Sequence, residues 1–241
     1  MTKDRVVAIH QPNFLPWMGF FNKIARSDAF ILLDEVQFPK TGGSWINHVH
    51  ILVNGQEAWM TIPIVRDYHG LRKISEMEIN DATPWRETML KTLQMNYARS
   101  SFFKEIFPIV TEWLHFKTKI LVEFNLNALQ RLIDLLSLSQ TELILQSSLS
   151  VETKSTDMLI DLVSAVHGNT YLCGGGAEGY QEDEKFQTAG IKLIYQNFQH
   201  PIYPQRANAQ FVHGLSILDA LMSCGVEETR NLLFNHPPTI G

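Results

Sequence analysis

Cysteine is nearly absent from this chain, which has only Cys173 and Cys224 among its 241 residues. Two cysteines make neither a disulfide framework nor a zinc-binding set, and their scarcity fits a reducing compartment. Long apolar runs are absent too: the run from Val6 to Ile9 is too short for the core of a signal peptide, and no segment is long enough to span a bilayer. We therefore predict a cytoplasmic protein without a membrane span.

An excess of positive charge is also missing. The formal net charge is -5 and the sequence pI is about 6.0, and no lysine-rich run occurs. The electrostatic field needed to hold a phosphate backbone is therefore lacking, which argues against nucleic acid as a partner. The 45% hydrophobic content is enough for a sizeable core. We expect a single α/β domain over residues 1 to 241 that acts on a small molecule, while the oligomeric state stays open.

Short apolar runs alternate with helical patterns at both ends of the chain. Strands are predicted at 5–9, 29–33, 141–146, 170–173 and 191–195, and helices at 19–27, 155–166, 182–189 and from 216 onward. We expect Ser155 or Thr156 to cap the helix that begins there. Apolar strands joined by helices are typical of a parallel sheet covered on both faces, whose carboxyl edge binds ligands.

The middle of the chain has a different pattern. Alternating segments between residues 45 and 64 are joined by Asn54-Gly55, which predicts an antiparallel hairpin. Thr83-Pro84 then opens a helical insertion at about 83–138. The predicted fold class is α/β: a mostly parallel, Rossmann-like sheet with flanking helices, possibly nucleotidyltransferase-like, plus the hairpin and the helical insertion.

The loop after the first strand is the first candidate site. It reads His10-Gln11-Pro12-Asn13-Phe14-Leu15-Pro16-Trp17, with aromatic residues that look exposed. The two prolines stiffen the backbone, which suits a loop that holds polar side chains in one geometry. His10 is a candidate catalytic residue, and Gln11, Asn13 and Trp17 are candidates for substrate binding. The alternative is that this loop only covers the edge of the sheet.

The second candidate follows the strand at 29–33. Candidate binding residues there are Asp34, Gln37, Lys40, Ser44 and Asn47. The turn Thr41-Gly42-Gly43-Ser44 offers amides and hydroxyls to an anion, although a plain solvated turn has the same composition.

The third candidate is the glycine-rich segment after the strand at 170–173. Gly174, Gly175 and Gly176 allow close approach of a ligand, and Tyr180 either closes over it or simply packs. The spacing matches neither a dinucleotide fingerprint nor a P-loop. Cys173 is a possible nucleophile, but a buried structural cysteine is the favoured interpretation.

The fourth candidate has the same composition as the first. His200-Pro201 and Tyr203-Pro204-Gln205 again combine histidine, amide and proline after a strand. His200 is a second candidate catalytic residue because histidine titrates near neutral pH, and Tyr203 and Gln205 are candidate binding residues. His213 precedes the last helix, whose amino terminus we interpret as an anion site.

Metal binding is not predicted. The available histidines are His10, His48, His50, His200 and His213, and no pair has the spacing of zinc ligands. The sequence does not identify a cofactor.

Four segments together resemble the WbqC-like family of bacterial proteins. They are residues 8–51, 171–180, 189–205 and 211–225. The resemblance implies a role in O-antigen (lipopolysaccharide) or other surface-polysaccharide biosynthesis, often beside enzymes that make nucleotide-linked amino sugars. No catalytic residues are transferred from it.

A weaker likeness at the level of fold concerns the nucleotidyltransferase and pantothenate-synthetase group. The order of strand, His10 loop and helix is similar to the start of those enzymes, where a histidine and glycine motif holds ATP phosphates. This chain has Gly19-Phe20 where that group has glycine-histidine, and "ETKSTD" at 152–157 only faintly resembles the group's lysine-serine signature. ATP-dependent acyl activation is an analogy only.

Three functions follow as hypotheses. The first is a transferase that moves an acyl or aminoacyl group onto the amine of a nucleotide-linked amino sugar, with a nucleotide sugar and an activated acyl donor as its small-molecule partners. The second is a nucleotidyltransferase or ATP-dependent ligase that holds magnesium through Asp34. The third is a non-catalytic binding or assembly protein of the same pathway.

Overall fold

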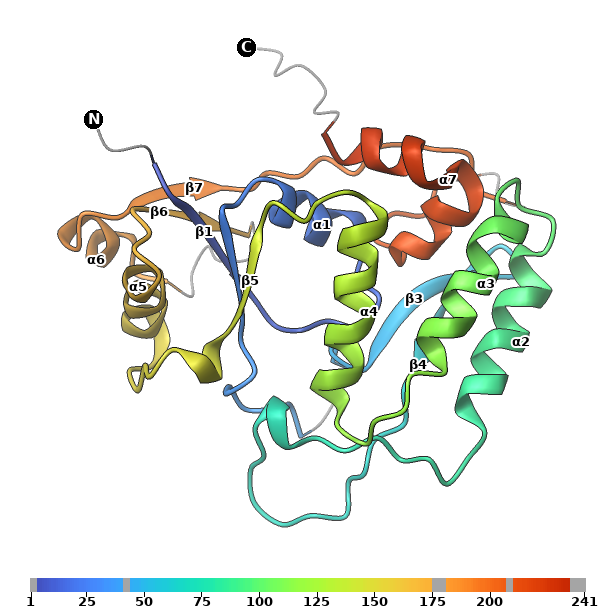
Figure 1. Cartoon of the computed structure of the whole chain (residues 1–241), viewed down its shortest axis with the longest axis horizontal. Helices are drawn as coiled ribbons and strands as arrows, with labels where there is room; N and C mark the ends of the chain where they lie inside the picture. The colour runs from blue at the N-terminus through green and yellow to red at the C-terminus, as the bar shows by residue number, and fades with distance from the viewer. Residues whose placement is uncertain (1–3, 41–43, 175–180, 207–209, 235–241) are drawn as a thin grey trace.

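A five-stranded parallel sheet forms the centre of the computed structural model, which describes residues 4–40, 44–174, 181–206 and 210–234 (Figure 1). The strands are β1 (Val6–His10), β2 (Ala29–Leu32), β5 (Glu142–Leu145), β6 (Thr170–Cys173) and β7 (Lys192–Tyr195). Their order across the sheet is β5-β2-β1-β6-β7, all parallel. Counted in chain order this is 3-2-1-4-5, the order found in Rossmann-type sheets, so the predicted fold class is confirmed.

Helices cover both faces of this sheet. Figure 1 shows α5 and α6 on one side, and α1, α4 and α7 on the other. Their bounds are α1 (Met18–Ala25), α4 (Leu121–Leu135), α5 (Ser155–Ala165), α6 (Asp183–Thr188) and α7 (Ile217–Phe234). Because side chains alternate along a strand, Val7 and Ile9 pack in the core under α5 and α6, while Ala8 packs in the larger core with α1, α4 and α7.

The long connection between β2 and β5 holds the hairpin and the middle helices. The hairpin joins β3 (His48–Val53) to β4 (Gln56–Thr61), and the helices are α2 (Trp85–Tyr97), α3 (Phe103–Leu114) and α4. The short 3-10 helices are η1 (Ile74–Glu76) and η2 (Gln146–Ser148). Asn54 and Gly55 both have positive φ, at 53° and 76°, as a two-residue hairpin turn requires. The predicted hairpin and helical insertion are confirmed. No helix in the described part of the chain is long and apolar enough to cross a bilayer.

The predicted cap of α5 is wrong. The residue before the helix is Lys154, and no side chain caps the first turn. The hydroxyl of Thr156 instead accepts a hydrogen bond from the backbone amide of Glu182 at 3.1 Å. Thr156 therefore joins α5 to the start of α6.

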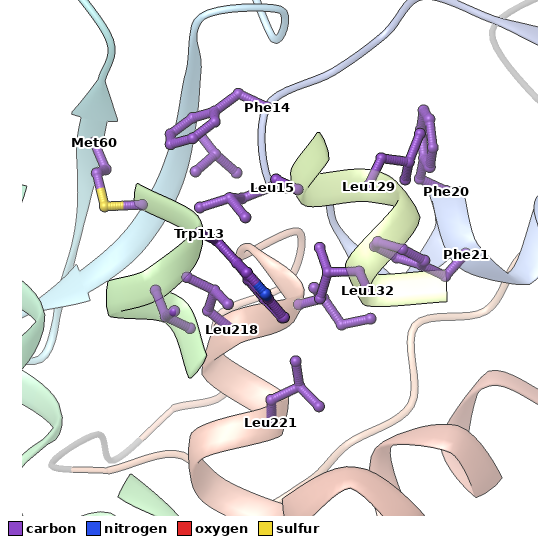
Figure 2. Close-up of a cluster of buried hydrophobic side chains, with 14 of the residues drawn as sticks. Phe14, Leu15, Phe20, Phe21, Met60, Trp113, Leu129, Leu132, Leu218 and Leu221 are labelled. Atoms are coloured by element: carbon purple, nitrogen blue, oxygen red, sulfur yellow. The ribbon is translucent and has the colours of Figure 1, made fainter. Parts of the chain in front are cut away.

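The prediction that the aromatic residues of the opening loop are exposed is also wrong for part of that loop. Phe14 and Leu15 are 0% and 2% exposed and belong to the main core. Figure 2 shows both residues within one cluster of side chains from several elements. Labelled neighbours in that view are Met60, Trp113, Leu129, Leu132, Leu218 and Leu221. The loop is therefore an internal part of the domain.

A buried loop needs hydrogen-bond partners for its backbone, and three other segments supply them. The side-chain amide of Asn125 on α4 donates to the carbonyls of Pro12 (2.8 Å) and Ile46 (2.6 Å). The Ser216 hydroxyl donates to the carbonyl of Leu15 at 2.7 Å. Further backbone bonds are Phe14 to the Trp45 carbonyl (2.8 Å) and Ile217 to the Pro16 carbonyl (2.9 Å). Proline suits this loop because it has no amide that would need a partner.

Asn125→Leu should destabilise the protein strongly. The leucine has a similar size but leaves two buried carbonyls without donors, so we expect a loss of about 2 kcal/mol or more in the free energy of unfolding, measured by urea denaturation. Gln130→Leu on the exposed side of the same helix is the matched control and should change stability by less than about 0.5 kcal/mol. Equal stabilities of the two variants would contradict the role given to Asn125.

Candidate active site at the carboxyl edge of the sheet

A cavity of about 390 Å³ lies where the strand order changes direction. The chain leaves β1 toward β2 on one side and leaves β6 toward β7 on the other, and a crevice between two such strands is the usual ligand site in open parallel sheets. The cavity is lined by His10, Trp17, Gly19, Phe20, Lys23, Gly174, Gln196, Asn197 and Phe198. Four segments thus meet at one place: the opening loop, α1, the end of β6 and the segment after β7. The sequence predicts this meeting for the opening loop and the segment after β7.

His10 ends β1 and is held as a neutral imidazole. Its Nδ1 lies 3.1 Å from the carbonyl of Gln11, and because a carbonyl only accepts, Nδ1 carries the proton. Burial, aided by the positive charge of Lys23, lowers the pKa of His10 to about 4. The other ring nitrogen, Nε2, is therefore unprotonated at neutral pH and can accept a proton. The ring packs edge-on against Phe20, with centroids 4.8 Å apart.

Lys23 brings a buried positive charge to the same cavity. Its side chain is 3% exposed, and Nζ donates to the carbonyl of Ile9 at 2.9 Å. In the described part of the chain it forms no ion pair. Burial lowers the pKa of this ammonium to about 8, so it still carries its charge at neutral pH. A buried ammonium with two donor positions that no described residue uses, and with a cavity beside it, is suited to an anionic ligand.

Gln196 fixes the opposite wall of the cavity. Its side-chain Nε2 donates to the backbone carbonyl of Gly19 (2.6 Å) and to Oδ1 of Asn22 (3.0 Å). Its backbone carbonyl accepts a hydrogen bond from the guanidinium of Arg26 (2.8 Å). These bonds tie the segment after β7 to α1, so the wall is part of the scaffold.

Trp17 joins the two histidine loops. Its indole stacks on His200 at 6.1 Å between centroids and 16° between planes, and it packs edge-on against Phe198 at 5.4 Å. Gly19 lies directly beneath: a Cβ at this position would be 2.3 to 2.6 Å from three atoms of the indole. The absence of a side chain at Gly19 therefore sets the position of Trp17.

His200 does not line the cavity. It sits in a cluster of rings that includes Tyr203, Phe211 and His213, and its Nδ1 lies 3.0 Å from the carbonyl of Pro201. Its Nε2 is buried and has no hydrogen-bond partner in the described residues. Burial lowers its pKa below the usual histidine range. The structure thus separates the two histidines: His10 borders the cavity, whereas His200 supports Trp17.

The remaining residues of the two histidine loops take mainly structural positions. The side chain of Gln205 bonds both the amide and the carbonyl of Val212 at 2.8 Å. Tyr203 is buried beside Asp219. The carboxyl group of Asp219 also accepts a hydrogen bond from the hydroxyl of Tyr97 at 2.9 Å. Gln11 is half-buried, and the Oδ1 atom of Asn13 is buried without a partner in the described residues.

At the predicted anion site before the last helix, the first three amides of α7 already have acceptors. The amides of Ile217, Leu218 and Asp219 already bond to the opening loop and to Ser216. His213 is exposed and packs edge-on against His200 at 5.6 Å.

The candidates after β2 lie outside the cavity lining. Asp34 is 3% exposed and its Oδ1 accepts from the amide of Ser147 at 3.0 Å, which stabilises η2. Gln37 is exposed and forms a backbone bridge with Lys73, and the carbonyl of Lys40 accepts from Arg66. The hydroxyl of Ser44 accepts from the amide of Ile46, while the side chain of Asn47 donates to the carbonyl of Ile62. These bonds build the base of the hairpin.

In the glycine-rich segment only Gly174 falls within the described residues and lines the cavity. Gly175, Gly176 and Tyr180 lie outside the described residues. Cys173 is fully buried and burial raises its thiol pKa, which argues against an activated nucleophile. Among the described residues no group of three or more His, Cys, Asp or Glu side chains is placed to hold a metal ion.

Lys23 and Gln196 are the site residues that sequence reasoning missed. Lys23 lies in a helix whose other residues, apart from Asn22, are apolar, and all residues from Met18 to Ile24 are buried. A lysine among the apolar residues of so short a helix is a signal in the sequence for a buried charge that needs a partner, because lysine is almost never fully buried unless it is paired. Gln196 directly follows β7, the position at which β1 has its own polar loop.

Comparison with known proteins identifies one family. The model of the WbqC-like protein family matches residues 11–231. The uncharacterized protein Rv1507c of Mycobacterium tuberculosis is 28% identical over 225 residues, which cover 92% of this chain and 94% of that protein. No solved structure matches the chain significantly.

Lys23→Met should remove a pH dependence of stability. The folded-state pKa of about 8 lies below the value of 10.5 in the unfolded chain, so the unfolded state binds more protons between these pH values and the wild type becomes more stable as the pH rises. Relative to Lys23→Met, the wild type should gain about 2 kcal/mol between about pH 8 and pH 10, measured by urea unfolding. Parallel pH curves for the two proteins would show that Lys23 is not buried as described.

Gly19→Ala and Gly174→Ala should behave differently. The first methyl group collides with Trp17 and should cost about 1 kcal/mol or more in the free energy of unfolding. The second meets nothing within 4 Å, so it should leave stability nearly unchanged while narrowing the cavity. Thermal unfolding and tryptophan fluorescence together test this pair. A stable Gly19→Ala protein with an unaltered emission spectrum would disprove the proposed contact.

Proposed function

Since this chain belongs to the WbqC-like protein family, we propose that it is an enzyme that forms an amide on the amine of a nucleotide-linked amino sugar. Membership in the family is compatible with a role in surface-polysaccharide biosynthesis. The transfer of an acyl or aminoacyl group is our proposal. The observation that carries it is the pairing of a buried ammonium and a neutral imidazole in one cavity of the sheet edge.

Lys23 supports a nucleotide-linked substrate. A nucleoside diphosphate brings negative charge, and the ammonium of Lys23 has two donor positions beyond its bond to Ile9. The amino end of α1, at Gly19 and Phe20, also lines the cavity, and helix amino termini favour anions. Gly174 adds no side chain on the opposite side, where there is room for a ligand to approach the backbone.

His10 is suited to accept the proton of the reacting amine. The amine nitrogen attacks the carbonyl carbon of an acyl thioester, and this nitrogen becomes strongly acidic as the C–N bond forms. Its proton moves to Nε2 of His10, the C–S bond breaks, and the thiolate that leaves takes up the proton. Because burial keeps the pKa of His10 at about 4, Nε2 is unprotonated before the reaction starts and, once protonated, readily passes the proton to the thiolate.

The strand order 3-2-1-4-5 is also compatible with nucleotidyl transfer, the alternative enzyme class. That chemistry would need acidic ligands for magnesium beside the cavity. Asp34, the residue considered for this role, does not line it and bonds to Ser147. We therefore favour acyl transfer.

His10→Gln should abolish most of the turnover while leaving the protein folded. Glutamine keeps a polar side chain but cannot accept a proton, so we expect kcat to fall by about 10²- to 10⁴-fold. The assay follows thiol release from an acyl thioester in the presence of a nucleoside-diphosphate-linked amino sugar. Lys23→Gln should instead raise KM for the nucleotide sugar more than it lowers kcat, because it removes a contact to the phosphates.

The control is His200→Gln, whose side chain packs against Trp17 outside the cavity lining. We expect this variant to lose less than tenfold in kcat. Full turnover in His10→Gln would remove the catalytic role of His10, and a larger loss in His200→Gln than in His10→Gln would transfer that role to the second histidine loop.

A further inference from the structure

A second cavity, of about 370 Å³, lies between β4 and α2 and shares no lining residue with the first. It falls within the size range of small-molecule sites, about 300–1,000 Å³. Its walls come from the hairpin, from the segment before α2 and from the first turns of that helix. The residues that matter for recognition are Trp59, Thr61, Thr83, Trp85, Thr88 and Thr92.

This cavity differs from the first in charge. No Asp, Glu, Lys, Arg or His is among its described lining residues, whereas His10 and Lys23 line the first. A charged ligand would therefore enter without a compensating partner, which is unfavourable. The lining selects a neutral ligand.

Hydroxyl groups supply the polar contacts. The hydroxyls of Thr88 and Thr92 donate to backbone carbonyls one turn earlier, at 3.0 and 2.8 Å, and keep lone pairs for another donor. Thr61 and Thr83 are exposed, and their hydroxyls make no hydrogen bond to the described residues. They can donate as well as accept. A ligand with several hydroxyl groups matches this set, whereas a hydrocarbon chain does not.

Two exposed tryptophans form the apolar part of the surface. Trp59, at the cavity wall, is 52% exposed, and Trp45 beside it is 44% exposed. Their ring centroids are 5.2 Å apart and the planes meet at 61°. The rings of His48 and His50 pack against Trp59, with centroids 4.2 and 3.4 Å away, so part of the indole is covered and the exposed part faces the cavity and the solvent. Exposed apolar surface that is contiguous, as between the neighbouring rings of Trp45 and Trp59, is a mark of interaction sites. The electron-rich face of an indole attracts polarised C–H groups.

We propose that this surface binds a neutral saccharide. A pyranose ring has a face of C–H groups and a rim of hydroxyls, which match the indole of Trp59 and the threonine hydroxyls. The site does not depend on the proposed acyl transfer, because it lies apart from His10 and Lys23 and is detected by binding alone. The competing occupant is a peptide that adds to the free edge of β4, since β4 pairs only with β3 in the described residues.

The test is titration of the whole protein with a panel of neutral tri- and tetrasaccharides of glucose, galactose, mannose and rhamnose, observed by calorimetry and saturation-transfer NMR. We expect at least one to bind, with Trp59→Ala weakening the affinity tenfold or more. Thr61→Val and Thr83→Val, which keep the shape and remove one hydroxyl each, should weaken it at least threefold. Leu71→Ala is the control, because Leu71 is a large apolar residue that is 64% exposed and outside this surface.

Trp59→Ala loses ring contacts with Trp45, His48 and His50 but no residue of the main core, so it should remain folded at the temperature of the binding assay, as checked by thermal unfolding. Saccharide binding should persist in the variants His10→Gln and Lys23→Met. The binding test can therefore be interpreted even if the acyl-transfer hypothesis fails. The proposal is overturned if no saccharide binds at millimolar concentration, or if the Trp59→Ala protein binds as well as the Leu71→Ala protein. Binding of unrelated extended peptides in place of saccharides, lost on Trp59→Ala, would also overturn it.

Discussion

The burial of the loop between β1 and α1 is the constraint on which the rest of this structure depends. A loop in the interior must satisfy every backbone donor and acceptor without water. Pro12 and Pro16 remove two donors, and the carbonyls of Pro12, Leu15 and Pro16 accept from Asn125, Ser216 and the amide of Ile217. The loop, the hairpin, α4 and α7 are thereby fixed relative to one another.

The site depends on that arrangement because the loop positions both ends of the cavity wall. His10 is the first residue of the loop and Trp17 the last, and both line the cavity. Helix α1 follows and places the ammonium of Lys23 against the carbonyl of Ile9. Burial lowers both pKa values, and the charge of Lys23 lowers that of His10 further. A charged lysine and a neutral histidine therefore coexist at neutral pH, which suits a site that holds an anion and moves a proton.

Charge distinguishes the cavity at the sheet edge from the cavity beside β4. The one at the sheet edge contains the buried ammonium, whereas the one beside β4 has threonine hydroxyls and indoles and no charged lining residue in the described part of the chain. This difference in charge is the reason that we propose a charged, activated substrate for the first cavity and a neutral saccharide for the second.

The sequence by itself determined the secondary structure and the class of fold, because apolar runs of strand length, helical periodicity and the Asn54-Gly55 turn are local signals. It also placed His10 and Gly174 at the carboxyl edge, since both directly follow parallel strands. It could not separate His10 from His200, because the two loops have the same composition and only packing shows that one borders the cavity and the other stacks on Trp17. The burial of Phe14 and the position of Gln196 were likewise decided by tertiary structure, because they depend on bonds between residues more than 100 positions apart, such as Asn125 with Pro12 and Gln196 with Gly19. The burial of Lys23 was also decided by packing.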